Sequence, residues 1–265
     1  KKLLLVGKGG QVGWELQRSL APLGEVIALD FDSTDFHADF TQPERLAETV
    51  RALRPDVIVN AAAHTAVDKA ESEPQLAATI NAEAPRVLAR CAAEQGAWLV
   101  HYSTDYVFDG SGHAPRAEDA ATAPLSVYGR TKLDGENAIR ASGCRHLILR
   151  TSWVYAARGG NFARTMLKLA AERDALTVID DQIGAPTGAE LLADVSAIVI
   201  RACQADASRA GTYHAVAAGQ TSWFDYARFV IEWARARGMP VKVAADAVRA
   251  VPTSAWPSPA RRPLN

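Results

Sequence analysis

Two residues, Tyr128 and Lys132, form a Y-x-x-x-K pair. On a helix, residues four apart lie on one face, so the phenol and the ammonium would be neighbours. A free phenol has a pKa near 10, and lowering it toward about 7 requires roughly 4 kcal/mol. A cation about 4 Å away supplies about that amount at an effective dielectric of ~20. The pair therefore predicts that Lys132 makes Tyr128 a proton donor or acceptor at neutral pH.

A third residue, Thr104, would lie beside this pair. It follows a predicted strand over residues 98–103, and open parallel sheets bind ligands at the carboxyl ends of their strands. A hydroxyl at that edge can hydrogen-bond a substrate carbonyl and polarise it for hydride attack. A tyrosine and a lysine at this spacing also occur as ordinary surface pairs, so the position of Thr104 is what favours the catalytic interpretation.

Gly7, Gly10 and Gly13 form a G-x-x-G-x-x-G turn directly after a predicted strand over residues 3–6. Glycine permits a tight turn and a close approach of the backbone to a pyrophosphate, and the helix that follows would offer free N–H donors. The same glycines could instead serve only the packing of helix on strand. Because a strand precedes the turn and a helix follows it, we interpret it as a dinucleotide-binding site.

Acidic residues after the next strands would complete that site. Asp30 ends the second predicted strand about twenty residues on, where a carboxylate can accept hydrogen bonds from the adenosine ribose. It favours NADH, because it would repel a 2′-phosphate unless a cation such as Lys8 compensates. Asp39 and Phe40 could similarly hydrogen-bond and pack against the adenine, although an aspartate before a helix is often only a turn residue.

Short β-branched or leucine-rich runs alternate with longer stretches of helical period, which indicates βαβ units around a parallel sheet. Thr41 and Glu44 have the spacing of a capping box, which predicts a helix from there to about Arg54. The predicted fold class is α/β, a Rossmann-type doubly wound parallel sheet. Six strands are predicted before residue 152, over residues 3–6, 26–29, a weak strand near His37, 57–60, 98–103 and 146–150.

After residue 152 the pattern loosens. It predicts helices over residues 161–173, 189–203 and 222–237, and short strands over 177–179 and 212–215. We therefore expect a dinucleotide-binding domain over residues 1–152, with returning segments near 189–217. Residues 153–265 would mainly form a smaller, C-terminal substrate-binding lobe.

The composition excludes several classes of protein. With 29 Lys+Arg against 30 Asp+Glu the net charge is −1, so no electrostatic footprint for a nucleic acid polymer is present. No apolar stretch approaches the roughly 20 residues of a membrane helix. Three widely spaced cysteines indicate free thiols. We expect a cytoplasmic protein that neither spans a membrane nor binds nucleic acid.

Taken together, the glycine turn, Thr104 and the Y-x-x-x-K pair resemble the extended short-chain dehydrogenases. Longer strings at residues 61–71, 103–110, 150–155, 181–187 and 262–265 are similar to those of the dTDP-4-dehydrorhamnose reductases and extend the resemblance across essentially the whole chain. The resemblance implies that NADPH or NADH reduces the C4 ketone of dTDP-4-dehydro-L-rhamnose to dTDP-L-rhamnose. This is the last step in making a sugar donor for bacterial surface polysaccharides, O antigen and lipopolysaccharide among them.

The resemblance also implies roles for individual residues. Tyr128 would protonate the developing alkoxide, Lys132 would tune Tyr128 and bind the nicotinamide ribose, and Thr104 would complete the triad. The residues implied at the cofactor, beyond the three glycines, Tyr128 and Lys132, are Gln11, Val12, Asp30, Asp39, Phe40, Ala63, His64, Thr65 and Tyr102. Those implied at the sugar nucleotide are Val67, Thr104, Asp105 and Trp153.

In some relatives a magnesium ion at a dimer interface is held by carboxylates that match Glu15 and Glu190. The resemblance therefore implies a homodimer with Mg²⁺ between its copies, although each residue alone is typical of a solvated helix face. The sequence ends within what resembles an R-P-x-N-S motif. We thus expect a further segment, with another family carboxylate, beyond Asn265.

Other functions fit parts of the sequence. Related 4,6-dehydratases carry a glutamate after Thr-Asp as the base for water elimination, but here Tyr106 holds that position. A C4 epimerase on the same scaffold would retain its NAD, whereas a reductase must exchange its cofactor at each turnover. The non-catalytic regulatory subunit of methionine adenosyltransferase also resembles this family. The intact set of Thr104, Tyr128 and Lys132 favours catalysis over that binding role.

Overall fold

A six-stranded sheet forms the larger part of the chain in the computed structural model, which describes residues 1–265. Its strand order is β10-β5-β4-β3-β1-β2, and every neighbouring pair is parallel. The order reverses between β1 and β3, the position at which such sheets bind ligands. The expected α/β fold is therefore confirmed. The strands are β1 (Lys2–Val6), β2 (Glu25–Leu29), β3 (Val57–Asn60), β4 (Trp98–Thr104), β5 (Arg145–Thr151) and β10 (Gly211–His214).

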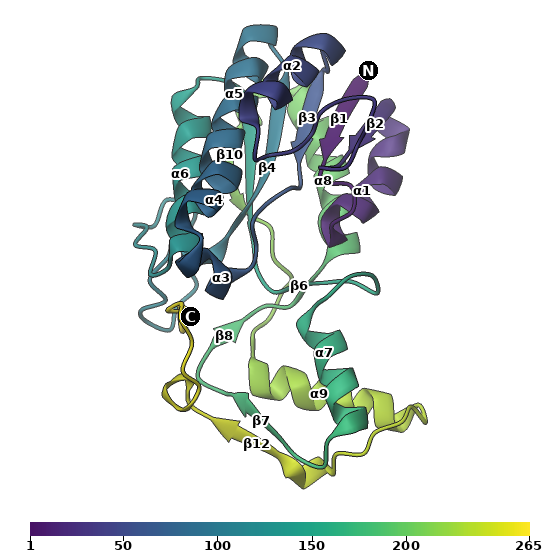
Figure 1. Cartoon of the computed structure of the whole chain (residues 1–265), viewed down its shortest axis with the longest axis vertical. Helices are drawn as coiled ribbons and strands as arrows, with labels where there is room; N and C mark the ends of the chain where they lie inside the picture. The colour runs from purple at the N-terminus through teal and green to yellow at the C-terminus, as the bar shows by residue number, and fades with distance from the viewer.

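Helices cover both faces of this sheet (Figure 1). Successive side chains of a strand point to opposite faces, so Leu4 and Val6 enter one core cluster while Leu3 and Leu5 enter the other. The first cluster packs against α2 (Pro43–Leu53), α5 (Ala84–Gln95) and α6 (Val127–Ala141). The second packs against α1 (Gln11–Leu20) and α8 (Ala189–Ala205).

The strand predicted near His37 is wrong, and the sheet ends at β2 on that side. Turns form instead: the N–H of Ser33 donates to Asp30 O at 3.0 Å, and the N–H of Thr41 donates to Asp39 Oδ1 at 2.8 Å. Aspartate side chains that bind nearby N–H groups compete with strand pairing. The predicted capping box is also wrong, because α2 has no side-chain cap and the Thr41 hydroxyl donates to Asp39.

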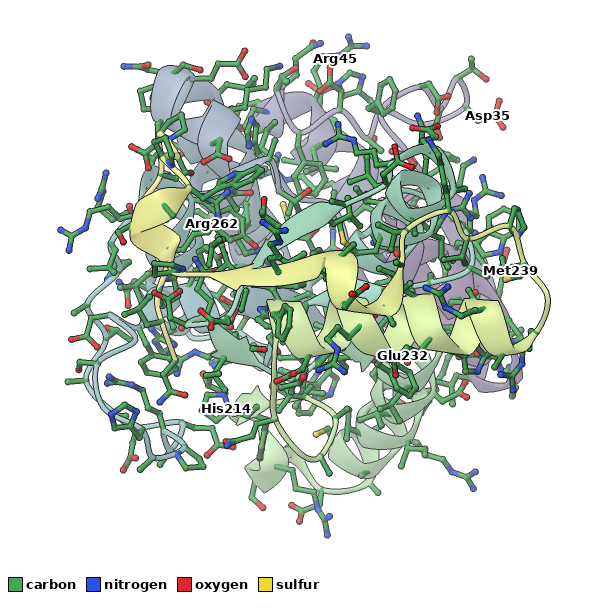
Figure 2. All side chains as sticks on the ribbon, turned by 90° about the horizontal axis from the view of Figure 1, so that it is seen from below. Asp35, Arg45, His214, Glu232, Met239 and Arg262 are labelled. Carbon is green, nitrogen blue, oxygen red and sulfur yellow. The ribbon has the colours of Figure 1, made fainter.

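A smaller part of the chain lies below the carboxyl edge of the sheet (Figure 1). It contains α7 (Phe162–Glu172), α9 (Trp223–Ala236) and the parallel pair β7 (Leu176–Ile179) and β12 (Val248–Val251). Its own core holds Met166, Ala170, Leu176, Val178, Ala227, Ile231, Val243 and Val248. In the view from below, β12 and α9 cross this part, with Met239 beyond one end of α9 and Arg262 beyond β12 (Figure 2).

Short elements connect the two parts. Two strand pairs lie between them: β6 (Val154–Tyr155) with β9 (Thr187–Gly188), and β8 (Ile183–Gly184) with β11 (Thr221–Ser222). The C-terminal segment returns to this boundary, where Leu264 O accepts the N–H of Ile183 at 2.8 Å. The remaining helices are α3 (Val67–Ser72), α4 (Pro74–Ala78), a π-helical turn (Thr79–Glu83) and 3₁₀ turns at Ala21–Leu23, Asp105–Val107, Ala207–Arg209, Ala245–Ala247 and Thr253–Ala255. None of the helices is long and apolar enough to cross a membrane.

Candidate active site

Helix α6 carries the Y-x-x-x-K pair and is fixed at its start by two caps. Ser126 Oγ accepts the N–H of Gly129 at 3.1 Å, and Glu71 accepts the N–H of Val127 at 2.7 Å. Glycine is required where the helix meets its neighbours, since a Cβ at Gly129 would lie 2.3 Å from Tyr106 O. The glycine at position 129 thus allows α6 to pack closely against the segment that follows β4.

Thr104, Asp105 and Tyr106 form that segment at the carboxyl end of β4. Thr104 is buried; its Oγ1 donates to Asp105 Oδ1 at 3.0 Å and accepts the N–H of Tyr106 at 3.2 Å. The ring of Tyr106 meets that of Tyr128 edge to face, with centroids 5.5 Å apart. The structure therefore brings Thr104 and Tyr128 together, as the sequence predicted, and adds Asp105 and Tyr106 to the same group.

The electrostatics of Tyr128 differ from the prediction. Burial raises its pKa to about 12, while a hydrogen bond with Thr104 lowers it and the charge of Asp105 raises it. Lys132 contributes nothing to this balance, because its amine is directed elsewhere. Tyr128 is consequently protonated at neutral pH and suited to give a proton away. Burial likewise raises the pKa of Asp105 to about 6.

The amine of Lys132 points inward, to β4. Lys132 is 2% exposed, and its Nζ donates to the backbone O of Tyr102 at 2.6 Å. It also lies 3.4 Å from Nε2 of His101. Burial lowers the pKa of Lys132 to about 8, against the opposing charge of Glu136. The sequence placed Lys132 in the site but gave no sign of these partners.

The glycine turn has the shape of a phosphate cradle. Gly7 has φ +87°, and a Cβ at Gly13 would lie 1.9 Å from Gly7 O, so both positions require glycine. A Cβ at Gly10 would meet only Gly7 O, at 3.5 Å, which leaves this side of the turn open. Helix α1 begins after Gly10 with no side-chain cap, so the N–H groups of its first turn, at Gln11 and Val12, remain available to an anion.

The acidic residues predicted at the cofactor lie in different settings. Asp30 sits at the end of β2 beside the glycine turn, where its Oδ2 accepts the N–H of Gly9 at 2.7 Å. Asp39 is half-buried and binds Thr41, and the ring of Phe40 packs in the core at 5% exposure. Asp30 thus follows the second strand as predicted and also contacts the turn, whereas the ring of Phe40 is already enclosed by the sheet and its helices.

The loop after β3 runs beside the turn. A Cβ at Gly7 would lie 2.6 Å from the N of Ala62, and the loop continues through half-buried Ala63 to exposed Thr65. His64 is held by its backbone, since its N–H donates to Asn81 Oδ1 at 2.8 Å and its O accepts from Asn81 at 3.1 Å. Its ring lies near Glu73, with Nε2 3.5 Å from Oε2.

Tyr102 contributes to this region differently from the prediction. Its side chain is buried on the α8 face of the sheet, where its hydroxyl bonds Ser196 at 2.5 Å. Only its backbone O reaches the site, as the acceptor for Lys132. The alternation of side chains along β4 explains both contacts.

A cleft of about 1230 Å³ opens beside this group, between the sheet and the smaller part. Tyr106 lines it, whereas Thr104, Tyr128 and Lys132 are outside the lining. Sequence reasoning missed most of the lining, because its residues are spread along the chain. The polar and aromatic members include Asp68, Tyr106, Gln182, Trp223, Arg249, Trp256, Arg261 and Arg262.

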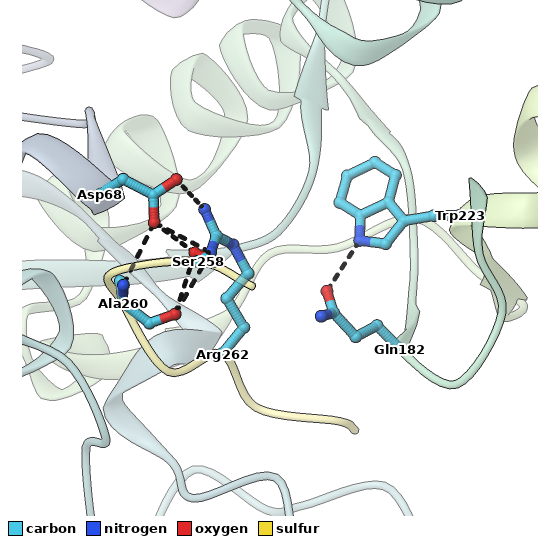
Figure 3. A network of polar contacts seen from close by, with 6 residues as sticks. All are labelled: Asp68, Gln182, Trp223, Ser258, Ala260 and Arg262. Atoms are coloured by element: carbon cyan, nitrogen blue, oxygen red, sulfur yellow. Dashed lines mark hydrogen bonds and ion pairs between the residues drawn. The ribbon is translucent and has the colours of Figure 1, made fainter. Parts of the chain in front are cut away.

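Two interactions shape the cleft (Figure 3). Arg262 forms a bidentate pair with Asp68, with Nη2 2.7 Å from Oδ2 and Nη1 3.1 Å from Oδ1, next to half-buried Val67. This pair lowers the pKa of Asp68 to about 2. Across the cleft, Trp223 Nε1 donates to Gln182 at 3.1 Å.

Trp153 has an unusual backbone conformation just after β5. Its φ is +46°, which is strained for a bulky residue. Its ring stacks on Trp223 with centroids 3.4 Å apart, and a Cβ at Gly184 would lie 2.5 Å from it. Packing against Trp223 and Gly184 therefore compensates the strain and orients the indole.

The described residues do not support the implied metal site within one chain. No group of three or more His, Cys, Asp or Glu side chains is arranged to hold a metal ion. Glu15 lies 3.8 Å from Arg18, and Glu190 is exposed in the first turn of α8. These residues do not fit a magnesium site in a single copy, and no step of the proposed chemistry uses a metal ion.

Comparisons with known proteins match the whole chain. The sequence model of the family described as "RmlD substrate binding domain" matches residues 1–265. A dTDP-4-dehydrorhamnose reductase of Escherichia coli K12 is 61% identical, over 99% of this chain and 87% of that protein. Crystal structures of dTDP-4-dehydrorhamnose reductases superpose with a TM-score of 0.87 in two cases. One is from Clostridium acetobutylicum (38% identical, 100% of this chain and 88% of that one), and the other is from Bacillus anthracis in complex with NADP (34% identical, with the same coverage). The chain therefore belongs to the dTDP-4-dehydrorhamnose reductase family.

Proposed function

We propose that this protein uses NADPH or NADH to reduce the C4 ketone of dTDP-4-dehydro-L-rhamnose to dTDP-L-rhamnose. The observation that carries the proposal is the grouping of Thr104 and protonated Tyr128 at the carboxyl edge of the sheet, beside a cleft of about 1230 Å³. The 61% identity to a dTDP-4-dehydrorhamnose reductase supports the same substrate.

The chain supplies the proton and the orientation for this reaction. A nicotinamide bound in this site would supply the hydride to C4. Thr104 donates a hydrogen bond to the C4 oxygen, for which its hydroxyl must turn away from Asp105. Tyr128 gives its phenolic proton to that oxygen as negative charge develops on it, and becomes a phenolate. Lys132 lies four residues along α6, and its amine would turn from Tyr102 O toward this phenolate to stabilise the charge.

The residues around the glycine turn would hold the cofactor. The open side of Gly10 and the free N–H groups of Gln11 and Val12 suit the pyrophosphate, and Asp30 suits the adenosine ribose. We assign the loop residues Ala63, His64 and Thr65, with the backbone of Tyr102, to the nicotinamide half. Asp39 and Phe40 would lie near the adenine through their backbone, since the Phe40 ring is enclosed.

The cleft would hold the sugar nucleotide. Asp105 and Trp153 would face the sugar, and Val67 would lie against it from α3. Arginines in the lining, Arg249, Arg261 and Arg262 among them, provide positive charge for a diphosphate. We also assign the substrate-binding role to the smaller part of residues 153–265, and the dinucleotide-binding role to residues 1–152 with the returning segments 189–217.

We further propose a homodimer acting in the cytoplasm. Exposed apolar side chains on neighbouring helices, Trp14 of α1 with Leu191 and Ile198 of α8, form a face suited to a second copy. Glu15 and Glu190 lie on the same two helices, so Mg²⁺ could join the copies only with ligands from both. The three buried free thiols suit a reducing compartment.

The test is the oxidation of NADPH or NADH, followed at 340 nm, with dTDP-4-dehydro-L-rhamnose generated in situ from dTDP-glucose. We expect oxidation that depends on every upstream enzyme, which would also rank the two cofactors. A folded protein that leaves both cofactors unoxidised would contradict the proposed reaction. Addition of EDTA, with size-exclusion chromatography in parallel, tests the metal and the dimer separately from catalysis.

A further inference from the structure

A buried chain of hydrogen-bonded polar groups ends at Lys132, and none of its residues lines the cleft. It runs from Ala62 through Asn60 and His101 to Lys132, and the last three residues are only 1%, 1% and 2% exposed. His101 is a buried titratable group that the proposed chemistry leaves without a role. Each link of the chain has a known distance, so the positions of its hydrogens can be deduced in order.

The first link fixes the amide of Asn60. The N–H of Ala62 donates to Asn60 Oδ1 at 3.1 Å. If the amide were turned over, two donors would face each other at that distance. Nδ2 of Asn60 must therefore point to Nδ1 of His101, which lies 3.0 Å away.

The second link fixes the tautomer of His101. Because Asn60 Nδ2 is a donor, Nδ1 of His101 must be the acceptor and carries no proton. The ring is neutral, since burial lowers the pKa of His101 far below its ordinary value and the charge of Lys132 lowers it further. A neutral imidazole has one N–H, so the proton is on Nε2.

The third link concerns Lys132. Nε2 of His101 is 3.4 Å from Lys132 Nζ. An ammonium has only donors and would present a hydrogen to another hydrogen. The free amine instead has a lone pair for Nε2–H and a hydrogen for Tyr102 O, which lies 2.6 Å from Nζ.

We propose that His101 is a positioning residue of the reductase: its Nε2–H opposes the ammonium form of Lys132 and stabilises the free amine left when Lys132 gives a proton toward the cleft. The inference rests on the proposed function. Proton balance is simple, since Tyr128 loses its proton to the C4 oxygen and Lys132 returns one toward the phenolate. Lys132 then regains a proton from solvent, which restores the ammonium.

The other titratable groups near Lys132 do not oppose its ammonium form. From α6, Glu136 faces it and favours the ammonium, but Glu136 is engaged by Arg150 at 2.7 and 2.9 Å. Tyr128 on the same helix is neutral at pH 7, and Asp105 acts on Tyr128. From β4, His101 is the titratable group that contacts the amine.

Nuclear magnetic resonance of the cofactor-free protein tests the inference without requiring turnover. Two-bond ¹H–¹⁵N spectra distinguish the tautomers of the six histidines, and the Cε shift of Lys132 reports its protonation, with the Lys132→Arg variant to assign it. We expect the Nε2–H tautomer at His101 and a Lys132 midpoint near pH 8. The Nδ1–H tautomer, or a Lys132 midpoint at the ordinary value for lysine, would overturn the proposal.

Two variants alter the contact between His101 and Lys132 and keep a polar side chain at the substituted position. His101→Asn keeps an acceptor for Asn60 and removes the donor at Lys132. Asn60→Asp should move the histidine proton to Nδ1, so that Nε2 accepts from the ammonium. We expect both to raise the Lys132 midpoint by about one pH unit or more, and to move the alkaline limit of the reductase rate upward equally.

The control is Ser196→Ala, which removes the bond to the Tyr102 hydroxyl on the opposite face of β4. This substitution perturbs a contact of the same strand but none of Lys132, so the titration midpoint of Lys132 should match that of the wild type. An equal shift in the control, or an unshifted midpoint in a folded His101→Asn protein, would overturn the inference. Absence of turnover with the expected tautomer would instead count against the proposed reaction alone.

Discussion

Two polar clusters of the molecule, one of which lines the cleft, differ in how much water reaches them. Lys132, His101 and Asn60 are at most 2% exposed, whereas the side chains of Asp68 and Arg262 are 45% and 23% exposed. The buried cluster has no water to supply missing partners, so its geometry dictates which atom carries each proton. The exposed pair can exchange its partners for water, so its main effect is to join α3 to the C-terminal segment.

The largest effect is expected from removing the hydroxyl of Tyr128, which shares helix α6 with the buried Lys132. Tyr128→Phe deletes the hydroxyl beside Thr104 but keeps the ring against Tyr106. We expect a loss of kcat of about 10³–10⁴-fold, because the general acid is gone. Cofactor affinity, measured by fluorescence titration, should be largely retained. Full activity in this variant would exclude Tyr128 as the proton donor.

The second prediction compares how much a buried ion pair and an exposed ion pair contribute to the free energy of unfolding. Glu136 is fully buried and binds Arg150 with both oxygens. Glu136→Ala should cost about 3–5 kcal/mol in the free energy of unfolding, because it leaves the Arg150 charge buried without its partner. The matched control is Glu94→Ala, which breaks an exposed pair with Arg51 and should cost less than about 1 kcal/mol. Urea denaturation of both variants measures the difference, and equal losses would contradict the role assigned to burial.

The third prediction is a pH dependence that arises in the buried cluster. Burial lowers the pKa of Lys132 to about 8, so the ammonium that stabilises the Tyr128 phenolate is lost as the pH rises through that value. The reductase rate should then fall about tenfold for each further pH unit. The exposed pair should not affect this limit, since Arg262 keeps its charge throughout. A rate that stays level up to about pH 10, the ordinary range of lysine, would show that the Lys132 charge is not needed.

The buried cluster also shows what sequence could and could not predict. The glycine turn, Thr104 and the Tyr128–Lys132 pair were found because each depends on short spacings within one element. The direction of the Lys132 amine could not be predicted, because it depends on contacts with β4 and, through His101, with β3. Strand parity offered one unused signal: His101 has the same parity as Leu99, whose side chain faces α5 and α6.

The exposed pair was harder to predict for a different reason. Asp68 and Arg262 are 194 residues apart, and no local pattern relates them. The weak strand near His37 failed because aspartate turns satisfied its backbone. The helices of the smaller part, in contrast, were predicted to within about two residues at most ends, since their amphipathic period is local.

The smallest expected effect belongs to the exposed pair. The hydrogen bonds of Arg262 lower the pKa of Asp68 from its ordinary value of 3.8 to about 2. The pair therefore stabilises the fold above about pH 4, and this contribution is lost as the pH falls through about 2. Because the side chain is 45% exposed, Asp68→Asn should cost less than about 1 kcal/mol at neutral pH. A double-mutant cycle with Arg262→Lys, repeated at neutral pH and near pH 2, measures the coupling. Coupling that persists at the lower pH would mean that packing of the C-terminal segment, rather than charge, joins it to α3.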